Sequence, residues 1–483
     1  MFYRGLFATL FFAFSTAVLA DEGAAGQAKF DLKDCHLDGI KEKVKCGQLQ
    51  VPENYAEPQG KTISLNFAVL PAIDLSQQKT PLMFLAGGPG QAAVELAAGL
   101  RKVFNESRKT RDLILVDQRG TGQSRPFQCD LSADTNIYQI LPEDFSAKDV
   151  NECLSGFDGE LSQYNSENAI RDFEALRQAL GYQQVNLYGG SYGTRAALVY
   201  MRLFPESIRS VVLDSVGPVE VPIGLFGQSS ARSFDLLLAN CRRDEACHRA
   251  FPELKAEFLQ VSAALEQKPQ SVTIPHPRLG EPTTFVISKS KFIGTLTQQL
   301  YTTGSRSFVP LVINQAAKGN YLPLAGLIAT TDGKQPLYLG LHMNIICNED
   351  FPKITQQALS ADADNDFGGD ISHNAMLTAC PLWPQYRPGK EFYQPVTADI
   401  PTLILSGELD PVTPPSNAEF SDNTLANSHH IVVNNTGHTV AMTTCASDII
   451  NEFMDVLTPA KLDESCLEDI PGESFMTGLN GSF

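Results

Sequence analysis

The feature that most constrains this chain is the stretch from residue 184 to residue 204, QVNLYGGSYGTRAALVYMRLF. Val185 and Leu187 follow the alternation of a strand, GGSYG comes next, and an apolar segment of helical length then runs without Gly or Pro up to Pro205. A Gly-x-Ser-x-Gly motif between a strand and a helix predicts a nucleophile elbow, because small residues let the two elements approach closely while the serine takes strained backbone geometry at the tip. Ser191 is therefore the candidate nucleophile, with a chance match of the motif as the alternative interpretation.

Short apolar runs and amphipathic segments alternate on both sides of this turn. Apolar runs of this length are typical of strands covered on both faces, and their alternation with helices is typical of a parallel sheet. The sequence therefore predicts an α/β fold with a mostly parallel central sheet, helices on both faces and an antiparallel hairpin at the edge of the sheet. Besides the strand before Ser191, the predicted strands are 44–51, 62–70, 81–86, 113–117, 210–214, 402–407 and 430–434, and the clearest helices are 166–180 and 448–457.

The alternation of strands and helices stops between residues 219 and 395. An insertion of this length cannot be a loop and must bury apolar surface of its own. Its amphipathic segments predict a mainly helical cap domain with a small β-hairpin at 271–288. The core is then divided into a first part, 21–218, and a second part, 396–483, whose tail after Cys466 is expected to lie on the surface.

The first twenty residues resemble a secretory signal, with Arg4 before an apolar run and Val18-Leu19-Ala20 before an acidic pair. The run is too short to span a bilayer, and the residue directly after the cleavage site is not a cysteine. We therefore expect an exported protein, periplasmic or secreted, without a stable membrane anchor. A net charge of −18 and the lack of a basic run argue against binding to nucleic acid or anionic lipid.

All ten cysteines lie beyond the signal, which fits an oxidising compartment. Their even count and short spacings favour five local disulfides, although metal ligation is a rival that lacks the usual clustered spacing. The expected pairs are Cys35 with Cys46, Cys129 with Cys153, Cys241 with Cys247, Cys347 with Cys380, and Cys445 with Cys466.

A serine nucleophile needs a general base and a carboxylate that orients the base. In doubly wound hydrolases these groups follow the serine in the order acid, histidine, each on a loop after a strand. Asp410 follows the strand TLILSG, and His438 follows the strand HIVVN within a glycine-bearing loop. The sequence therefore predicts a triad of Ser191, Asp410 and His438, with Asp214 as the alternative acid.

The tetrahedral intermediate of acyl transfer needs hydrogen-bond donors aimed at its oxyanion. One donor is expected to be the backbone N–H of Tyr192, directly after the nucleophile, and the other that of Gly88 in the turn AGGPG. The alternative interpretation of AGGPG is a tight turn without a catalytic role.

Five motifs in order carry a family resemblance: GGPG at 87–90, DQRGTGQS at 117–124, GGSYGTR around Ser191, GELDPVTPP around Asp410 and GHT around His438. Together they resemble the proline iminopeptidase and tripeptidyl aminopeptidase branch of the α/β-hydrolase superfamily over nearly the whole mature chain. The resemblance implies an α/β-hydrolase fold with an inserted helical cap, and it implies that Asp117 and Arg119 brace the turn near the site. One departure is Ala86, where iminopeptidases usually carry histidine, and it favours the secreted tripeptidyl-aminopeptidase-like group.

Relatives that act on free N-termini bind the α-ammonium with carboxylates of the cap, and Glu349 and Asp350 are the candidates here. The alternative is an ordinary acidic pair. A carboxylate at that place would give exopeptidase selectivity, because a buried ammonium without a counter-charge is strongly disfavoured.

We therefore expect an exported serine hydrolase that cleaves peptides near a free N-terminus and uses neither metal nor cofactor. Asp362, Asp364 and Asp366 resemble the opening of a calcium loop, but the glycine is displaced and His373 stands at the twelfth position, so a solvated loop is favoured. A carboxylesterase with the same triad and a non-catalytic binding module on the same fold are the rival interpretations.

Overall fold

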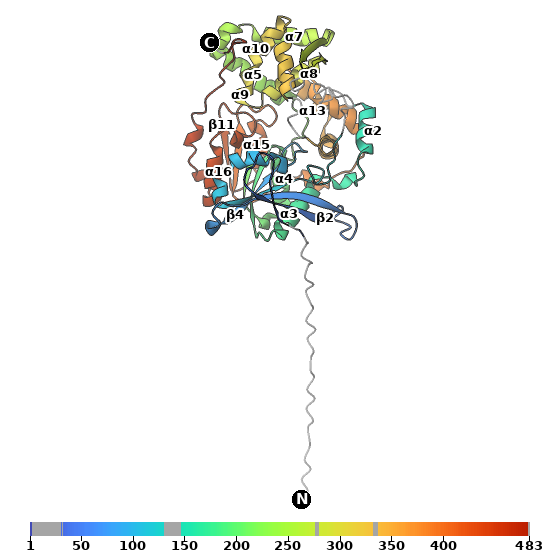
Figure 1. Ribbon diagram of the computed structural model, residues 1–483, viewed down its shortest axis with the longest axis vertical. Helices are drawn as coiled ribbons and strands as arrows, with labels where there is room; N and C mark the ends of the chain where they lie inside the picture. The colour runs from blue at the N-terminus through green and yellow to red at the C-terminus, as the bar shows by residue number, and fades with distance from the viewer. Residues whose placement is uncertain (2–29, 31, 130–145, 276–279, 332–336, 482–483) are drawn as a thin grey trace.

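The structure is a computed structural model that describes residues 1, 30, 32–129, 146–275, 280–331 and 337–481. The expected signal at 1–20 lies outside this part of the chain except for Met1. Figure 1 shows a sheet-containing body and a group of helices above it.

A nine-stranded sheet with the order β1-β2-β3-β5-β4-β6-β7-β10-β11 forms the body. The pairs from β5 to β11 are parallel, whereas β1, β2 and β3 join antiparallel at one edge, so the predicted α/β class and edge hairpin are confirmed. The strand bounds are β1 Lys33–Cys35, β2 Val44–Pro52, β3 Thr62–Leu70, β4 Lys79–Leu85, β5 Arg111–Val116, β6 Val185–Gly190, β7 Ile208–Asp214, β10 Thr402–Gly407 and β11 Ser428–Val433.

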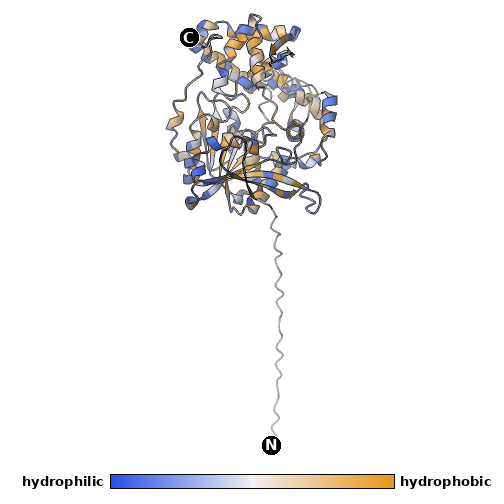
Figure 2. Ribbon diagram, in the orientation of Figure 1, coloured by the Kyte–Doolittle hydropathy of each residue, from blue (hydrophilic) through white to orange (hydrophobic). Residues whose placement is uncertain are grey.

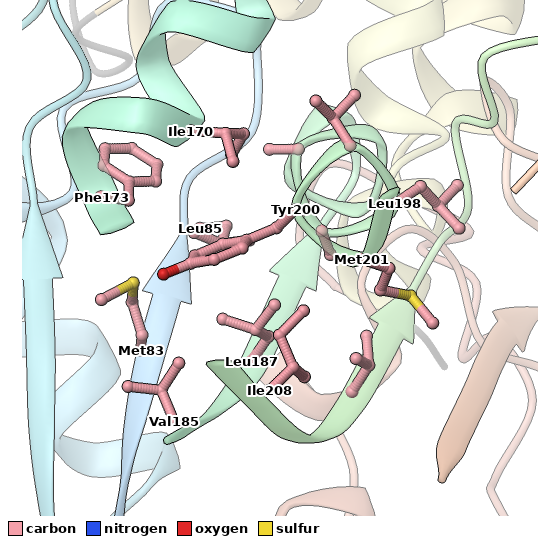
Figure 3. Close-up of a cluster of buried hydrophobic side chains, with 14 of the residues drawn as sticks. Met83, Leu85, Ile170, Phe173, Val185, Leu187, Leu198, Tyr200, Met201 and Ile208 are labelled. Atoms are coloured by element: carbon pink, nitrogen blue, oxygen red, sulfur yellow. The ribbon is translucent and has the colours of Figure 1, made fainter. Parts of the chain in front are cut away.

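Helices cover both faces of the sheet because its central strands are apolar on both. In β4, Met83 and Leu85 belong to the cluster under α3 (Ser166–Ala179) and α4 (Tyr192–Leu203). Figure 3 shows this cluster, with Ile170 and Phe173 of α3 beside Tyr200 of α4. The alternate residues of β4, Leu82 and Phe84, belong to the cluster on the opposite face, under α1 (Ala97–Val103) and α16 (Ala446–Val456). Truncating any of these side chains to alanine should cost about 2–5 kcal/mol of folding free energy.

The insertion after β7 is mainly helical, as expected, but it has two apolar clusters rather than one. The first holds the upper helices in Figure 1 around four phenylalanine rings, at positions 234, 258, 292 and 367. The second packs the later helices against the body, including Tyr192. Figure 2 shows orange and blue alternating on these helices. Their bounds are α5 Gly227–Arg243, α6 Glu245–Ala250, α7 Leu254–Gln267, α8 Lys289–Gln299, α9 Thr303–Arg306, α10 Val309–Ala317, α11 Leu322–Thr331, α12 Leu339–Ile345, α13 Gln356–Ala363 and α14 Asn374–Ala379.

A two-stranded hairpin, β8 Gln270–Pro275 and β9 Pro282–Ile287, lies among the upper helices where the sequence predicted one. A π-helical turn, Ile346–Asp350, extends α12. The remaining helices, α2 Ala147–Ser155 and α15 Pro415–Asp422, lie in the body.

The tail after Cys466 departs from expectation, because it does not simply lie on the surface. Glu473 and Arg306 of the insertion form a buried ion pair, with 2.7 Å between carboxylate and guanidinium Nε. Asn240 of α5 also donates to Glu473 at 2.7 Å, and Phe475 is buried in the upper cluster. The tail thus ties the insertion down. Sequence reasoning missed this contact because two buried side chains in an otherwise polar segment leave no periodic pattern.

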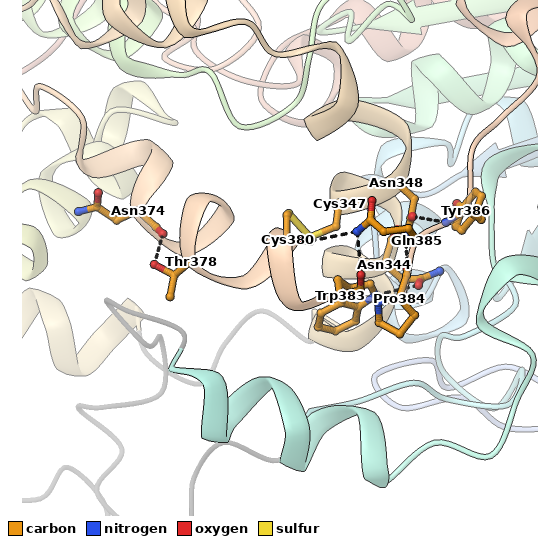
Figure 4. The surroundings of a disulfide bond; sticks show 10 residues. All are labelled: Asn344, Cys347, Asn348, Asn374, Thr378, Cys380, Trp383, Pro384, Gln385 and Tyr386. Atoms are coloured by element: carbon orange, nitrogen blue, oxygen red, sulfur yellow. Dashed lines mark hydrogen bonds between the residues drawn. A yellow bond between two sulfur atoms is a disulfide. The ribbon is translucent and has the colours of Figure 1, made fainter.

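The ten cysteines form the five predicted disulfides. Figure 4 shows the Cys347–Cys380 bond, which joins the π-helical turn to the segment carrying Trp383, whose indole N–H donates to Asn344 at 2.9 Å. Five disulfides are typical of a protein that matures in an oxidising compartment. Within the described residues, no helix combines the length and apolarity needed to cross a membrane.

Candidate active site

The predicted elbow is present between β6 and α4. Ser191 has φ 58° and ψ −126°, a backbone conformation that a residue with a side chain rarely adopts. Two glycines make the turn possible. A Cβ at Gly189 would lie 2.2 Å from the carbonyl oxygen of Gly193, and a Cβ at Gly193 would lie 2.1 Å from that of Leu85. Strand and helix therefore approach as closely as the motif predicts.

The other candidate residues lie at the same edge of the sheet. Strands β6, β7, β10 and β11 are adjacent and parallel, so their carboxyl ends meet at one edge. Ser191 follows β6, Asp214 ends β7, Asp410 follows β10, and His438 follows β11. These four positions, far apart in the chain, thus lie at one edge of the sheet.

Asp410 and His438 are joined directly. The ring Nδ1–H of His438 donates to Asp410 Oδ2 at 2.8 Å, which leaves Nε2 as the basic nitrogen. Asp410 is fully buried, and its other oxygen accepts from the N–H groups of Val412 and Thr413 at 2.9 Å each. The hydroxyl of Thr413 also donates to Oδ2 at 2.7 Å and lies 3.1 Å from the ring nitrogen. The carboxylate is therefore fixed before any substrate arrives.

Burial and pairing act in opposite directions on the pKa values of these two groups. Burial would lower the pKa of the His438 ring, but the charge and hydrogen bond of Asp410 outweigh it, so that pKa is raised. Burial would raise the pKa of the Asp410 carboxyl, but the same partner and the two backbone donors leave it lowered. The pair is thus arranged as a carboxylate that stabilises a positive imidazolium.

Asp214, the alternative acid, has other partners. It accepts from the hydroxyl of Tyr188 at 2.6 Å and from the N–H groups of Val440 and Ala441 at 2.8 and 2.9 Å. Its pKa is raised by burial. Asp214 therefore anchors the loop that follows His438 and does not contact the ring, which leaves Asp410 as the orienting acid.

The Gly-rich turn after β4 lies against the elbow. A Cβ built on Gly87 would be 3.3 Å from the Cβ of Ser191, and Gly88 has φ +109°, which favours glycine. Tyr192 is the first residue of α4, so its backbone N–H has no acceptor within the helix. The two predicted oxyanion donors, Gly88 and Tyr192, thus flank the nucleophile on adjoining segments.

The insertion holds the histidine loop. The N–H of His438 donates to the carbonyl oxygen of Tyr301 at 2.8 Å, and the two rings meet edge-on with centroids 5.1 Å apart. A Cβ at Gly437 would lie only 2.1 Å from that same carbonyl. Thr303 adds a hydrogen bond from its hydroxyl to the carbonyl of Asn435 at 2.7 Å. These contacts place the base without taking part in the chemistry.

The insertion also holds the Gly-rich turn. The N–H of Tyr338 donates to the carbonyl of Gly90 at 2.8 Å, and Nδ1 of His342 lies 2.9 Å from the carbonyl of Pro89. Since a carbonyl can only accept, the His342 ring donates from Nδ1. Burial lowers the pKa of that ring. Both catalytic loops of the body are therefore fastened to one inserted region.

The predicted substrate-binding carboxylates have internal partners. Both oxygens of Asp350 contact Arg195 of α4, at 2.9 and 3.0 Å, in a buried ion pair. Glu349 accepts from the N–H and hydroxyl of Ser166 at 2.8 and 2.6 Å, and burial raises its pKa to about 7. Asp350 thus stabilises the seam between body and insertion, whereas Glu349 borders a cavity of about 550 Å³ beside Tyr386.

Asp117 and Arg119 brace the turn after β5, as the resemblance implied. Asp117 accepts from Asn66 at 2.7 Å and from the N–H of Val94 at 2.9 Å. Arg119 forms a buried pair with Asp172, with two contacts of 2.7 Å.

The acidic segment that resembled a calcium loop serves a helix instead. Asp362 accepts from the first N–H groups of α5, at Gly227 and Gln228, at 2.8 and 3.0 Å, and it lies 2.6 Å from Nε2 of His373. Asp366 pairs with Lys255 at 3.2 Å. In the described part of the chain, no group of three His, Cys, Asp or Glu side chains could hold a metal ion.

The parallel sheet, the strained serine after β6 and the acid and histidine after its last two strands define an α/β hydrolase, and the chain belongs to that superfamily. Residues 80–230 match the sequence family described as the alpha/beta hydrolase fold, and residues 365–466 match the family described as TAP-like protein.

Three curated relatives extend this result. A putative hydrolase, YuaR, of Escherichia coli is 27% identical over 82% of this chain and 82% of its own length. The serine protease Hip1 of Mycobacterium tuberculosis is 25% identical over 76% of both chains. A tripeptidyl aminopeptidase of Streptomyces lividans is 29% identical over 40% of this chain and 39% of its own length. Relatives across this range carry the names of hydrolases and serine peptidases, so the chain is a hydrolase.

Sequence reasoning missed Thr413 and Tyr301. Thr413 lies three residues after Asp410 in the segment DPVTPP, so its position beside the acid was a signal that could have been used. Tyr301 lies more than a hundred residues before His438 in the helical insertion, and nothing in the local pattern links the two.

Proposed function

We propose that this protein is an exported serine peptidase that cleaves amide bonds near the free N-terminus of peptides. The observation that carries the proposal is the hydrogen bond from His438 to the buried Asp410, at the sheet edge where the strained Ser191 also lies. A serine in this setting can be activated by the imidazole, whose tautomer the acid fixes.

In the proposed reaction, Ser191 attacks the scissile carbonyl while Nε2 of His438 takes the hydroxyl proton. The backbone N–H groups of Tyr192 and Gly88 stabilise the oxyanion. His438 then returns the proton to the leaving amine, and an acyl-enzyme remains on Ser191. Water hydrolyses this ester with the same base, which restores the serine. Every proton and acyl transfer in this scheme is accounted for by these side chains and water.

Peptides with a free N-terminus are the proposed substrates, and the names of the tripeptidyl aminopeptidase and the serine protease among the relatives support this choice. Glu349 is the better candidate for an ammonium partner, because it borders the cavity beside Tyr386, whereas Asp350 is held in a buried ion pair with Arg195. Export is supported by the five disulfides.

Labelling with a fluorophosphonate probe tests the nucleophile. The wild-type protein should label, and Ser191→Ala should not label while keeping its thermal transition. A wild-type protein that fails to label would favour a non-catalytic binding module.

Comparing three kinds of substrate separates a peptidase from a carboxylesterase. Free-amine peptide anilides should be cleaved faster than their N-acetylated forms, and mass spectrometry of products from a peptide pool gives the number of residues released. Equal cleavage of acetylated peptides would remove the exopeptidase assignment. Turnover of simple esters without any peptide cleavage would make the protein an esterase.

A further inference from the structure

The carboxamide of Gln91 is a polar group without a partner beside the candidate nucleophile. Gln91 follows the turn 87–90, and its main-chain N–H donates to the carbonyl of Gly87 at 3.2 Å. Its main chain also bridges to Leu337 of the insertion. The side chain is half-buried, yet its carboxamide makes no hydrogen bond to any residue in the described ranges. A half-buried amide left in this state is available for a ligand.

This carboxamide and Ser191 both lie against Gly87. A Cβ built on Gly87 would lie 2.9 Å from Oε1 of Gln91 and 3.3 Å from the Cβ of Ser191. The two atoms therefore lie within about 6.2 Å of each other, the sum of these distances. Gly87 of the Gly-rich turn lies beside both. An acyl group carried by Ser191 therefore comes within reach of this carboxamide.

We infer that Gln91 is a substrate-binding residue whose Oε1 accepts a hydrogen bond from the nitrogen next to the scissile carbonyl on the acyl side. In a single released residue that nitrogen is the α-amine, and in a longer released peptide it is a backbone N–H. The site would thus select aminoacyl and peptidyl groups over simple carboxylic acyl groups. This inference rests on the proposed acyl-enzyme at Ser191.

The chemistry of a carboxamide fits this role. Its oxygen accepts from an amine or an amide N–H alike, so one side chain serves both substrate types. When the substrate lacks that nitrogen, the amide stays unpaired in a half-buried place, and binding is weakened twice, by the lost bond and by the lost solvation. The bridge to Leu337 holds the main chain of Gln91 in place before the substrate binds.

A double-mutant cycle between enzyme and substrate tests the inference. The substrates are a tri-alanine p-nitroanilide and its depsipeptide analogue, in which lactate replaces the alanine next to the scissile bond and oxygen replaces one N–H. With the wild-type enzyme, kcat/KM should fall about tenfold from the peptide to the analogue. With Gln91→Met, which keeps the length and loses the hydrogen bond, the two substrates should differ less than about twofold.

Gln91→Glu is the matched control, because it keeps an acceptor oxygen at the same place and should preserve the discrimination. Both variants should still label with the fluorophosphonate, which separates this result from a failure of the Ser191 assignment. An undiminished tenfold difference in Gln91→Met would overturn the inference. Loss of the difference in a labelled Gln91→Glu would overturn it as well.

Discussion

The sheet body and the inserted helices build the candidate active site in different ways. The body supplies the candidate reacting groups, each placed by the carboxyl end of a parallel strand. The insertion supplies contacts to the loops that carry them, through Tyr301 for the histidine loop and Tyr338 for the Gly-rich turn. Chemistry and positioning are thus divided between two regions. Changes in the body should affect the reaction itself, whereas changes in the insertion should affect the geometry and stability that support it.

The largest effect is expected in the body, from Asp410→Asn. The amide cannot hold His438 in the required tautomer or stabilise its charged form, so kcat should fall by about 10² to 10⁴. Because Asp410 keeps the pKa of His438 raised, the acid limb of the kcat/KM profile should also move to lower pH. Steady-state kinetics over a pH series measures both.

Asp214→Asn is the matched control for that change, since Asp214 is equally buried but contacts the chain after His438 and not the ring. The acid limb of the kcat/KM profile should move less in Asp214→Asn than in Asp410→Asn. The reverse order would make Asp214 the orienting acid.

At the seam between the two regions, Arg195→Met should destabilise the protein by about 3–5 kcal/mol, because the buried Asp350 would lose its bidentate partner and keep only Lys353, 3.7 Å from its Oδ1, as a counter-charge. The double variant Arg195→Met, Asp350→Leu removes both charges and should recover most of that loss. Denaturant unfolding measures each variant. Equal stability of the single and double variants would contradict a buried pair.

Glu349 provides a pH-dependent test of the same seam. Burial raises its pKa from 4.5 to about 7, so the folded protein keeps a proton that the unfolded chain releases. The contribution of Glu349 to stability is therefore greatest below about pH 4.5 and falls, by up to about 3 kcal/mol, as the pH rises to about 7. Glu349→Gln should flatten that part of the stability curve, and a curve of unchanged slope would refute the shift.

The smallest effect is expected in the insertion. Tyr301→Leu removes the ring that meets His438 edge-on and should lower kcat about tenfold with little change in KM, because aromatic contacts contribute about 0.5–1.5 kcal/mol. Tyr301→Phe keeps the ring and should stay near wild type. A loss in Tyr301→Phe as large as in Tyr301→Leu would assign the effect to the hydroxyl instead.

The two regions also differ in how far the sequence predicts them. Ser191, Asp410 and His438 could be found because each follows a short apolar strand, and parallel strands bring their ends to one edge whatever lies between them. The neighbouring spacing of the cysteines likewise gave the five disulfides. These features depend on local pattern together with a general topological rule.

No such topological rule predicts how the helices of the insertion pack on the body. Its helices were visible from their amphipathic spacing, but the contact of Tyr301 with His438 depends on how those helices pack on the body. The same holds for Asp350, whose carboxylate was expected to face substrate and instead pairs with Arg195. Long-range ion pairs and loop contacts leave no periodic signature in either partner.

The buried pair of Glu473 with Arg306 has a consequence for the growing chain. Synthesis runs from the N-terminus, so the serine emerges long before the imidazole, and the residue that locks the insertion emerges later still. A nascent chain therefore holds a nucleophile with no base to activate it. The proposed triad can therefore be complete only when almost all of the chain has been made.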